Sequence, residues 1–283
     1  MKLPAFSSNV MNLNVNENVP FLTYKQMEDI PFINHAFSTR LGGVSAGEFS
    51  TMNLALNRGD NREDVITNYK LFCNATGLDF NTLVASAQDH NTVVRKVTTA
   101  DYGIGITKPR DMDSVDALVT NQENVTLVTY YADCTPVFFV DKKNKVIALA
   151  HAGWRGTVNK ICQNVIETMV NDYNSDTSDI HCFIGPAISK CCYEIDQSCY
   201  NEFGKVNGLN LDDIMTPLDN GKYMADLLET NKQVLVLPGV PKENIIISDV
   251  CTQCNSELLW SHRATKGHRG TMCAFMCIKP VNN

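Results

Sequence analysis

Apolar residues along the chain fall into short runs with the spacing of either strands or helices. Two runs dominate the middle of the chain, residues 126–141 (TLVTYYADCTPVFFVD) and residues 145–153 (KVIALAHAG), and both are rich in valine and other apolar residues. The polar segment DKKNK separates them, which is typical of a hairpin between two buried strands. We therefore predict a hairpin that places Cys134 and His151 at the same end of a sheet.

Three other segments have the spacing of amphipathic helices. In residues 61–73, Val65, Tyr69 and Phe72 recur on one helical face. A second helix is predicted to start at Thr157, a favourable N-cap residue, and to bury an apolar stripe. That stripe consists of Val158, Ile161, Cys162, Val165, Ile166, Met169 and Val170. Residues 224–240 predict a third helix that ends at a Pro-Gly pair.

Strand composition marks most of the remaining apolar segments. Residues 35–45 predict a strand broken by a Gly-Gly turn, and residues 82–97 predict two strands joined by a loop that carries His90. The other predicted strands lie in residues 111–129, where a pair is expected, and in residues 179–188 and 244–251.

The order of these segments indicates the fold class. The chain shows no internal repeat, low-complexity tract or recognisable linker. We therefore predict an α+β fold in which mixed β-sheets pack against flanking helices in a single domain. Residues 1–30 are largely polar and rich in asparagine, so we expect a partly extended N-terminal lead-in there and a single domain over residues 31–283.

Composition and charge narrow the class of protein. The 283 residues carry a formal net charge of −7, which argues against a dedicated nucleic-acid surface. No apolar run approaches the roughly 18 residues of a membrane span, and no signal peptide is recognisable. We expect a cytoplasmic protein without a nucleic-acid or membrane partner, in which most of the 11 cysteines are reduced.

His90, Cys134 and His151 are the first candidate site. Zinc binds imidazole nitrogen and thiolate sulfur, and a catalytic zinc keeps three protein ligands with one position open. A single thiolate leaves the ion with a net positive charge, which suits a phosphate or a polarised oxygen. The three residues are far apart in the sequence, however. On spacing alone, a buried structural cysteine and two hydrogen-bonded histidines are the simpler interpretation.

Two segments that combine arginine with glycine are candidates for binding an anion. In HAGWRGT, Gly153 and Gly156 allow the backbone to approach a ligand closely, and Arg155 precedes the predicted helix N-terminus. In FSTRLGGVS, Arg40 is followed by two glycines. An ordinary turn with an exposed arginine explains the first segment equally well and is the simpler interpretation of the second.

Four further cysteines have a spacing that a structural zinc site can use. Cys251 and Cys254 form a C-x2-C pair, and Cys273 and Cys277 form a C-x3-C pair after 18 intervening residues. Both pairs adjoin strand-like runs, where a cysteine usually serves as a small buried apolar residue. We favour that interpretation. No chemistry is assigned to the other cysteines, which are Cys73, Cys162, Cys182, Cys191, Cys192 and Cys199.

A multicopper oxidase site can be tested by counting ligands. Such a site needs several copper ions, each held largely by imidazoles. The chain has six histidines and no His-x-His pair. It cannot build that site alone.

Several segments, taken in order, closely resemble a known family. They are HAFSTRLGGVS, TMNLAL with RGD, DALVT, ADCTPVFFVD, AHAGWRGT, GPAISKCCYEID and SHRATKGHRG, and they cover nearly the whole chain from His35 onward. The combination of ADC-x-P with HAGWRGT is highly specific. On these motifs the chain resembles the laccase-domain family, also described as YfiH-like or polyphenol oxidoreductase proteins.

The resemblance implies an αββα-like fold and a zinc site. The zinc ligands would be the histidine of a Gln-x-His segment, the cysteine of the ADC motif and the histidine of the HAGWRG motif, which are His90, Cys134 and His151 here. It also implies a purine nucleoside phosphorylase that acts on adenosine, inosine and methylthioadenosine together with phosphate. Adenosine deamination would be an additional activity, and copper is the alternative metal that the family name suggests.

Further roles follow from that resemblance. Arg40 and Arg155, helped by the helix N-terminus after Gly156, would hold phosphate, and Arg263 is a weaker candidate. Zinc deaminases carry a His-x-Glu signature, which this chain lacks, so Asp133 beside the cysteine ligand is the candidate proton shuttle. A structural or capping aspartate is an equally good interpretation.

The chain also departs from the family pattern. The family usually reads Gln-Val-His-Gly where residues 88–91 read QDHN, so the substrate preference and the surroundings of the ligand are left open. His262 stands where the family commonly has an aromatic residue. Arg263 and Arg269 stand where the family tends to carry arginines.

Three alternative functions stay open at this point. The same three ligands could hold copper in a polyphenol oxidase, because thiolate and imidazole suit copper. Cys134 could be the nucleophile of a hydrolase, with His151 or His90 as its base. The chain could also be a non-enzymatic, zinc-stabilised binding protein.

Overall fold

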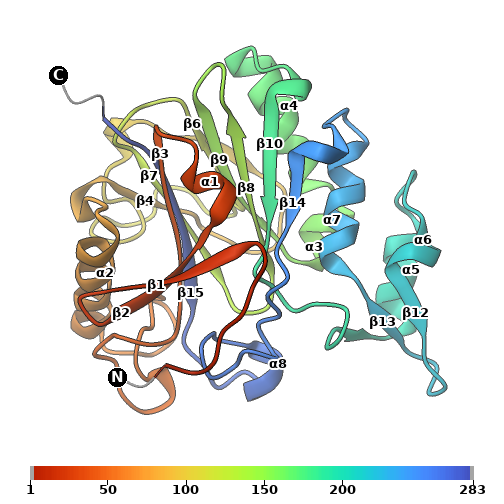
Figure 1. The fold of residues 1–283 in the computed structure, drawn as a ribbon, viewed down its shortest axis with the longest axis horizontal. Helices are drawn as coiled ribbons and strands as arrows, with labels where there is room; N and C mark the ends of the chain where they lie inside the picture. Colours follow the sequence, from red (N-terminus) through yellow and green to blue (C-terminus); the bar gives the residue numbers. More distant parts are fainter. Residues whose placement is uncertain (1–2, 281–283) are drawn as a thin grey trace.

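The computed structural model describes residues 3–280, and the body of the protein is a sandwich of two six-stranded sheets (Figure 1). The first sheet contains, in spatial order, β1 (Met11–Asn16), β2 (Val19–Tyr24), β3 (Ile33–Ser38), β15 (Met272–Ile278), β7 (Thr126–Tyr131) and β4 (Leu83–Ala85). The second contains β14 (Ile245–Ile247), β10 (Ile180–Ile184), β8 (Thr135–Asp141), β9 (Val146–Ala152), β6 (Ala117–Thr120) and β5 (Val94–Lys96).

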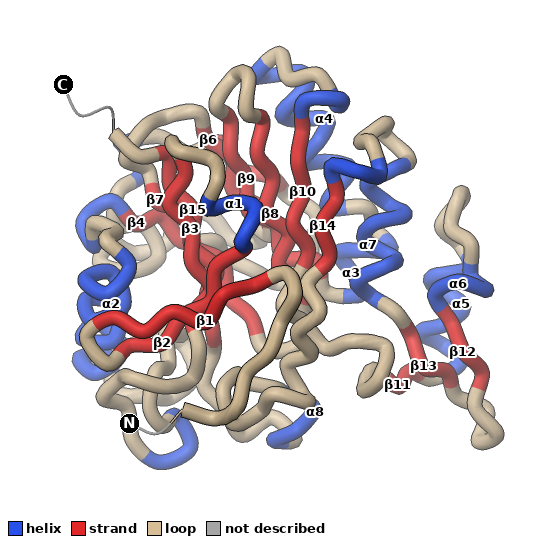
Figure 2. The backbone as a smooth tube through the Cα atoms, in the orientation of Figure 1, coloured by secondary structure: helices blue, strands red, loops and turns tan. Residues whose placement is uncertain are grey.

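Helices cover the outer faces of the two sheets, and a small third sheet projects from one side (Figure 2). The third sheet has the order β11 (Glu194–Ile195), β13 (Tyr223–Ala225) and β12 (Met215–Pro217). The helices are α1 (Lys25–Glu28), α2 (Arg62–Thr76), α3 (Trp154–Val158), α4 (Ile161–Tyr173), α5 (Gln197–Gly204), α6 (Leu211–Ile214), α7 (Leu227–Val236) and α8 (His262–Thr265).

The alternation of side chains along β15 shows how the layers form. Met272, Ala274 and Met276 pack into the core between the two sheets, whereas Cys273 and Cys277 pack into the core under α2. Strand residues alternate between faces, so an apolar run with no polar position is expected for a strand buried on both sides. Residues of α4 and α7 cover the second sheet in the same way. The predicted α+β fold with helix–sheet–sheet–helix layers is confirmed.

The predicted central hairpin is formed by β8 and β9. The two strands are antiparallel, and Pro136 pairs with His151, so Cys134 and His151 lie at one end of the sheet as expected. The apolar run of residues 126–141 forms two strands rather than one, however. Asp133 adopts a left-handed φ of 85°, and the chain passes there from β7 in the first sheet to β8 in the second. The strand pair expected in residues 111–129 is likewise divided, because β6 and β7 lie in different sheets.

Two local expectations differ from the structure. Within the predicted lead-in, β1 and β2 form an antiparallel hairpin at the edge of the first sheet, and Tyr24 on β2 is fully packed in the core. The Tyr24 hydroxyl donates a hydrogen bond to the Gly185 carbonyl, which ties the hairpin to the second half of the chain. Thr157 is not an N-cap, because α3 already begins after Gly153. Lys160, with a left-handed φ of 64°, separates α3 from α4.

No helix within residues 3–280 has both the length and the apolar character needed to cross a membrane.

Candidate metal centre and substrate cavity

The structure brings His90, Cys134 and His151 together at the open end of the β8–β9 hairpin. Their donor atoms all lie within 4.8 Å of one another, and Nε2 of His90 is 3.8 Å from Sγ of Cys134. Nitrogen and sulfur ligands of a tetrahedral zinc ion are separated by about 3.5 Å. The three residues therefore fit a single metal ion after small adjustments.

The buried carboxylate of Asp116, next to β6, organises this cluster. It accepts a hydrogen bond of 2.7 Å from Nδ1 of His151, which leaves Nε2 of that ring for the metal. The backbone amides of Asp89, His90 and Asn91 donate to the same carboxylate at 3.2, 3.1 and 3.0 Å. These bonds hold His90 in a left-handed conformation with a φ of 71°. Asp116 was not among the residues expected at the site, because the segment DALVT predicts only a strand.

Electrostatics within the cluster favour a deprotonated thiol. Burial alone would raise the pKa of Cys134, but the charge and hydrogen bonds of His151, and then of His90, outweigh burial and lower that pKa to about 6. Burial would lower the pKa of His151, but Cys134 and Asp116 outweigh it and raise that pKa to about 9. A thiolate is the form of cysteine that binds a metal, so the surroundings of Cys134 suit a ligand.

Polar residues fix the loop that carries His90. The side-chain amide of Gln88 bonds both backbone groups of Tyr130 in β7, as donor at 2.8 Å and as acceptor at 2.6 Å. Asp89 accepts a hydrogen bond from the Ser114 hydroxyl, and the side chain of Asn91 donates to the same hydroxyl. The two residues that depart from the family pattern thus tie the loop to the segment that precedes Asp116.

Gly153 lies directly against the ligands. A Cβ atom at this position would be 3.0 Å from Sγ of Cys134 and 3.0 Å from Cδ2 of His90. The close approach predicted for this glycine is therefore an approach to two of the candidate metal ligands. Gly156 is buried inside α3, where a Cβ would meet the carbonyl oxygen of His151 at 3.2 Å.

A cavity of about 170 Å³ opens onto the three ligands. Arg58, Arg110 and Arg269 line it, together with Tyr130 and other neutral residues, and no aspartate or glutamate of the described chain does. Within residues 3–280 none of these arginines forms an ion pair with a carboxylate. Nε of Arg269 is buried without a hydrogen-bond partner. Burial, and then the charge of Arg58, lower the pKa of Arg269 to about 10. The charge at this end of the cavity suits an anion.

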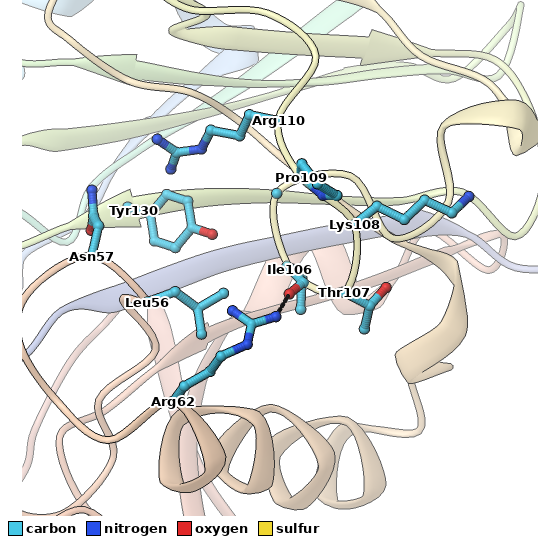
Figure 3. Close-up of a pocket in the computed structure, with 10 residues that line it drawn as sticks. Leu56, Asn57, Arg62, Ile106, Thr107, Lys108, Pro109, Arg110 and Tyr130 are labelled. Atoms are coloured by element: carbon cyan, nitrogen blue, oxygen red, sulfur yellow. Dashed lines mark hydrogen bonds between the residues drawn. The ribbon is translucent and has the colours of Figure 1, made fainter.

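A second cavity of about 500 Å³ adjoins the first and shares Asn57, Arg110 and Tyr130 with it. Figure 3 shows Arg110 next to the ring of Tyr130, and Arg62 bonded to the carbonyl oxygen of Ile106 at 3.0 Å. The two cavities together provide a polar, cationic end at the metal ligands and a wider space beyond the Tyr130 ring. Sequence analysis assigned no role to Arg58, Arg110 or Arg269, although Arg58 lies in the RGD segment and Arg269 in the last quoted motif.

The arginines that the sequence proposed for phosphate lie elsewhere. Arg40 donates a hydrogen bond to the Ser256 carbonyl and stacks on the ring of Trp260, with its guanidinium carbon 3.9 Å from the ring centroid. Arg155 is exposed in α3 and stacks on Trp154. Neither lines the cavity at the metal ligands. Their role in phosphate binding stays a prediction, as does that of Gly156.

Asp133 and Arg263 take part in hydrogen bonds that connect separate segments of the chain. The carboxylate of Asp133 accepts hydrogen bonds from the Thr252 hydroxyl at 2.6 Å and from the Arg263 amide at 2.7 Å. The guanidinium of Arg263 donates to the Glu194 carbonyl at 3.0 Å, and Arg263 does not line the cavity. These contacts fit the structural interpretation of Asp133, and its role in proton transfer stays a prediction.

Comparison with known proteins places the chain in a family. A family model described as multi-copper polyphenol oxidoreductase laccase matches residues 34–279. The chain belongs to this family. Its relatives include a Bacillus subtilis protein named purine nucleoside phosphorylase YlmD, 33% identical over 86% of this chain and 87% of the relative. A Bacteroides thetaiotaomicron protein named purine nucleoside phosphorylase is 30% identical over 89% of this chain and 93% of the relative.

Solved structures of family members have the same fold. The crystal structure of YlmD from Geobacillus stearothermophilus gives a TM-score of 0.87 at 31% identity and covers 95% of this chain and 99% of that one. The structure of the Bacillus licheniformis hypothetical protein YfiH gives a TM-score of 0.88 at 30% identity, over 94% and 99% of the two chains. The fold and family that the motifs implied are thereby confirmed.

The ligand set of this family member suits one metal ion at the cavity. Two imidazoles and one thiolate converge there, and the other four histidines take part in neither of the ligand clusters found within residues 3–280. A multicopper centre needs several imidazoles for each copper ion. The family description therefore does not transfer to the chemistry of this site.

We expect Asp116→Asn to lower the affinity for the metal by about 10–100-fold, because loss of the outer carboxylate loosens His151 and the loop of His90. Competition with a chelating dye measures this affinity. Asp141→Asn is a matched control, because Asp141 is also buried and accepts backbone amides at the opposite end of β8. An equal loss in both variants would mean that the effect is one of general stability.

Proposed function

We propose that the chain is a zinc-dependent purine nucleoside phosphorylase that acts on adenosine, inosine and methylthioadenosine. One observation carries this proposal: three arginines, none of which pairs with a carboxylate among residues 3–280, line the same cavity as His90, Cys134 and His151. An anionic co-substrate such as phosphate matches that charge. The names of the relatives support the same activity.

In this proposal the residues of the cavity position two substrates for one displacement. Arg58, Arg110 and Arg269 hold phosphate so that its oxygen faces the anomeric carbon of the ribose. The C–N bond to the purine breaks as the C–O bond to phosphate forms, and the proton that the phosphate gives up passes to the departing purine. The products are the sugar 1-phosphate and the free base. Tyr130 offers an aromatic surface for the substrate at the junction of the two cavities.

The ligand set adds a second proposed activity. Bound zinc would supply a Lewis acid that stabilises negative charge and activates water, as in the zinc deaminases with His/Cys ligands. We propose adenosine deamination at the same cavity on this ground. Asp133, the residue that the motifs suggested for moving a proton, would have to leave its bonds to the Thr252 hydroxyl and the Arg263 amide.

The lowered pKa of Cys134 also suits a second candidate function, a hydrolase with a thiolate nucleophile. Metal binding distinguishes the two, because a metal-bound thiolate is a poor free nucleophile. A hydrolase of this kind would be most active without metal, whereas the phosphorylase would need it. A copper-dependent phenol oxidase would need copper rather than zinc, and a binding protein would show no turnover.

The test is an assay of the zinc-loaded protein with adenosine or inosine, with and without phosphate, followed by chromatography. We expect adenine or hypoxanthine to appear only with phosphate, and inosine to appear slowly from adenosine without it. Release of base that does not depend on phosphate would indicate hydrolysis instead. Absence of any product while zinc is bound would end the nucleoside proposal.

A further inference from the structure

Four cysteines form a second cluster near the small projecting sheet. Sγ of Cys191 is 3.6 Å from Sγ of Cys192 and 3.6 Å from Sγ of Cys254, and Cys192 and Cys254 are 3.4 Å apart. All four sulfur atoms, with that of Cys251, lie within 4.8 Å of one another. We propose that Cys191, Cys192, Cys251 and Cys254 bind one structural zinc ion.

The distances agree with a tetrahedral site. Zinc–sulfur bonds of about 2.3 Å place the ligands of a four-thiolate site about 3.8 Å apart, close to the separations in this cluster. A polynuclear iron–sulfur cluster needs more room between its thiolates. Four thiol groups also exceed what one disulfide would use, and the closest pair is farther apart than the about 2.0 Å of a disulfide. A single ion accounts for all four residues.

The backbone brings the two cysteine pairs together independently of any metal. β10 and β14 are parallel neighbours, so the segments that follow them start at the same end of the sheet. Ala187 and Cys251 form a β-bridge there, and the Thr252 amide donates to the Ala187 carbonyl at 3.0 Å. The Ser189 amide donates to Sγ of Cys251 at 3.4 Å. An amide that donates to sulfur is a common outer partner of a metal-bound thiolate.

Cys251 and Cys254 therefore lie beside Cys191 and Cys192, and not beside Cys273 and Cys277 as their spacing in the sequence suggested. Cys273 and Cys277 lie on β15 and are buried under α2. Cys191 and Cys254 are exposed, so a metal ion can reach the cluster from solvent. No part of this cluster lines the cavity at His90, Cys134 and His151.

The position of the cluster indicates what the ion would do. The chain leaves the second sheet at residues 185–192, builds the projection of α5, α6 and the third sheet, and returns at α7 (Figure 1). The cluster connects Cys191 and Cys192, at the start of the projecting segment, with the turn at residues 251–254. Thr252 in this turn bonds Asp133, the residue before Cys134. A bound ion would hold the projection against the body and steady the turn behind the first metal site.

Metal analysis of the full chain, purified under reducing conditions, tests the proposal. We expect two zinc ions per wild-type chain and one in Cys134→Ala, whose zinc should show only sulfur ligands by X-ray absorption. Cys191→Ser with Cys254→Ser should also keep one zinc, with mixed nitrogen and sulfur ligands. Cys199→Ser is the matched control, because Cys199 lies in α5 of the same projection but outside the cluster, and it should keep both ions.

The zinc content of Cys134→Ala tests the four-cysteine site even if the double variant does not fold. A folded Cys134→Ala chain without zinc would overturn the proposal, and so would a disulfide between any of the four cysteines in the mass spectrum. The phosphorolysis assay is separate from this count. Failure of one proposal therefore leaves the other standing.

Discussion

Cys134→Ala is expected to remove one metal ion per chain and to abolish phosphorolysis. The variant leaves two imidazoles as the only protein ligands, and it removes the thiolate, which is the softest of the three donors. The loss of affinity should exceed the roughly 10–100-fold that an outer partner of a metal ligand contributes. Metal content and product formation are measured on the same preparation.

Cys73→Ala is the control for this variant, because Cys73 is equally a free cysteine but is buried in α2, on the far side of the first sheet. It should keep both metal and activity. If Cys134→Ala lost its activity while the metal stayed in place, Cys134 would act as a nucleophile. If metal were lost and activity kept, the metal would have no part in the reaction.

The second large effect is expected for Arg269→Met. Loss of one preorganised donor to a charge that develops in the transition state typically costs about 10²–10³-fold in rate. We expect a decrease of that size in kcat/KM for phosphate, with little change in KM for the nucleoside. Methionine fills a similar volume and removes a half-buried charge beside Arg58, so the melting temperature should not fall.

Arg155→Met separates this expectation from the one based on sequence. Arg155 is exposed in α3 and lies outside the cavity lining, so its loss should leave the phosphate dependence unchanged. A large decrease in kcat/KM for phosphate in Arg155→Met, with none in Arg269→Met, would indicate that phosphate binds at the HAGWRGT segment instead. Arg110→Met provides a second test of the cavity, because Arg110 lies in both cavities.

Local sequence patterns predicted the helices and strands better than they predicted which strands pair with each other. The hairpin that carries Cys134 and His151 follows from two apolar runs around a polar turn, and its register places both residues at one end. The same patterns could not assign β7 and β8 to different sheets, because a strand buried on both faces looks alike in either one. The turn at Asp133 carries no glycine that would have marked the change of sheet.

The site was only partly accessible from sequence for a related reason. The three candidate metal ligands stood in recognisable motifs, but Asp116, Arg58 and Arg110 reach the site from segments that are distant in the sequence. The cysteine pairs show the same limit. Spacing along the chain joined Cys251 and Cys254 to a later pair on β15, whereas parallel pairing of β10 with β14 brings them to Cys191 and Cys192.

The place of β15 in the first sheet has a consequence for synthesis of the protein. Within residues 3–280 this strand follows every other strand in the sequence, yet it lies between β3 and β7 and pairs with both. Until residues 272–278 leave the ribosome, the β1–β2–β3 and β7–β4 parts of the sheet have no strand between them. Their inner edges stay unpaired during translation, which favours intermolecular strand pairing. Completion of the first sheet therefore waits for its last strand and closes long sequence separations, and such folding is slow.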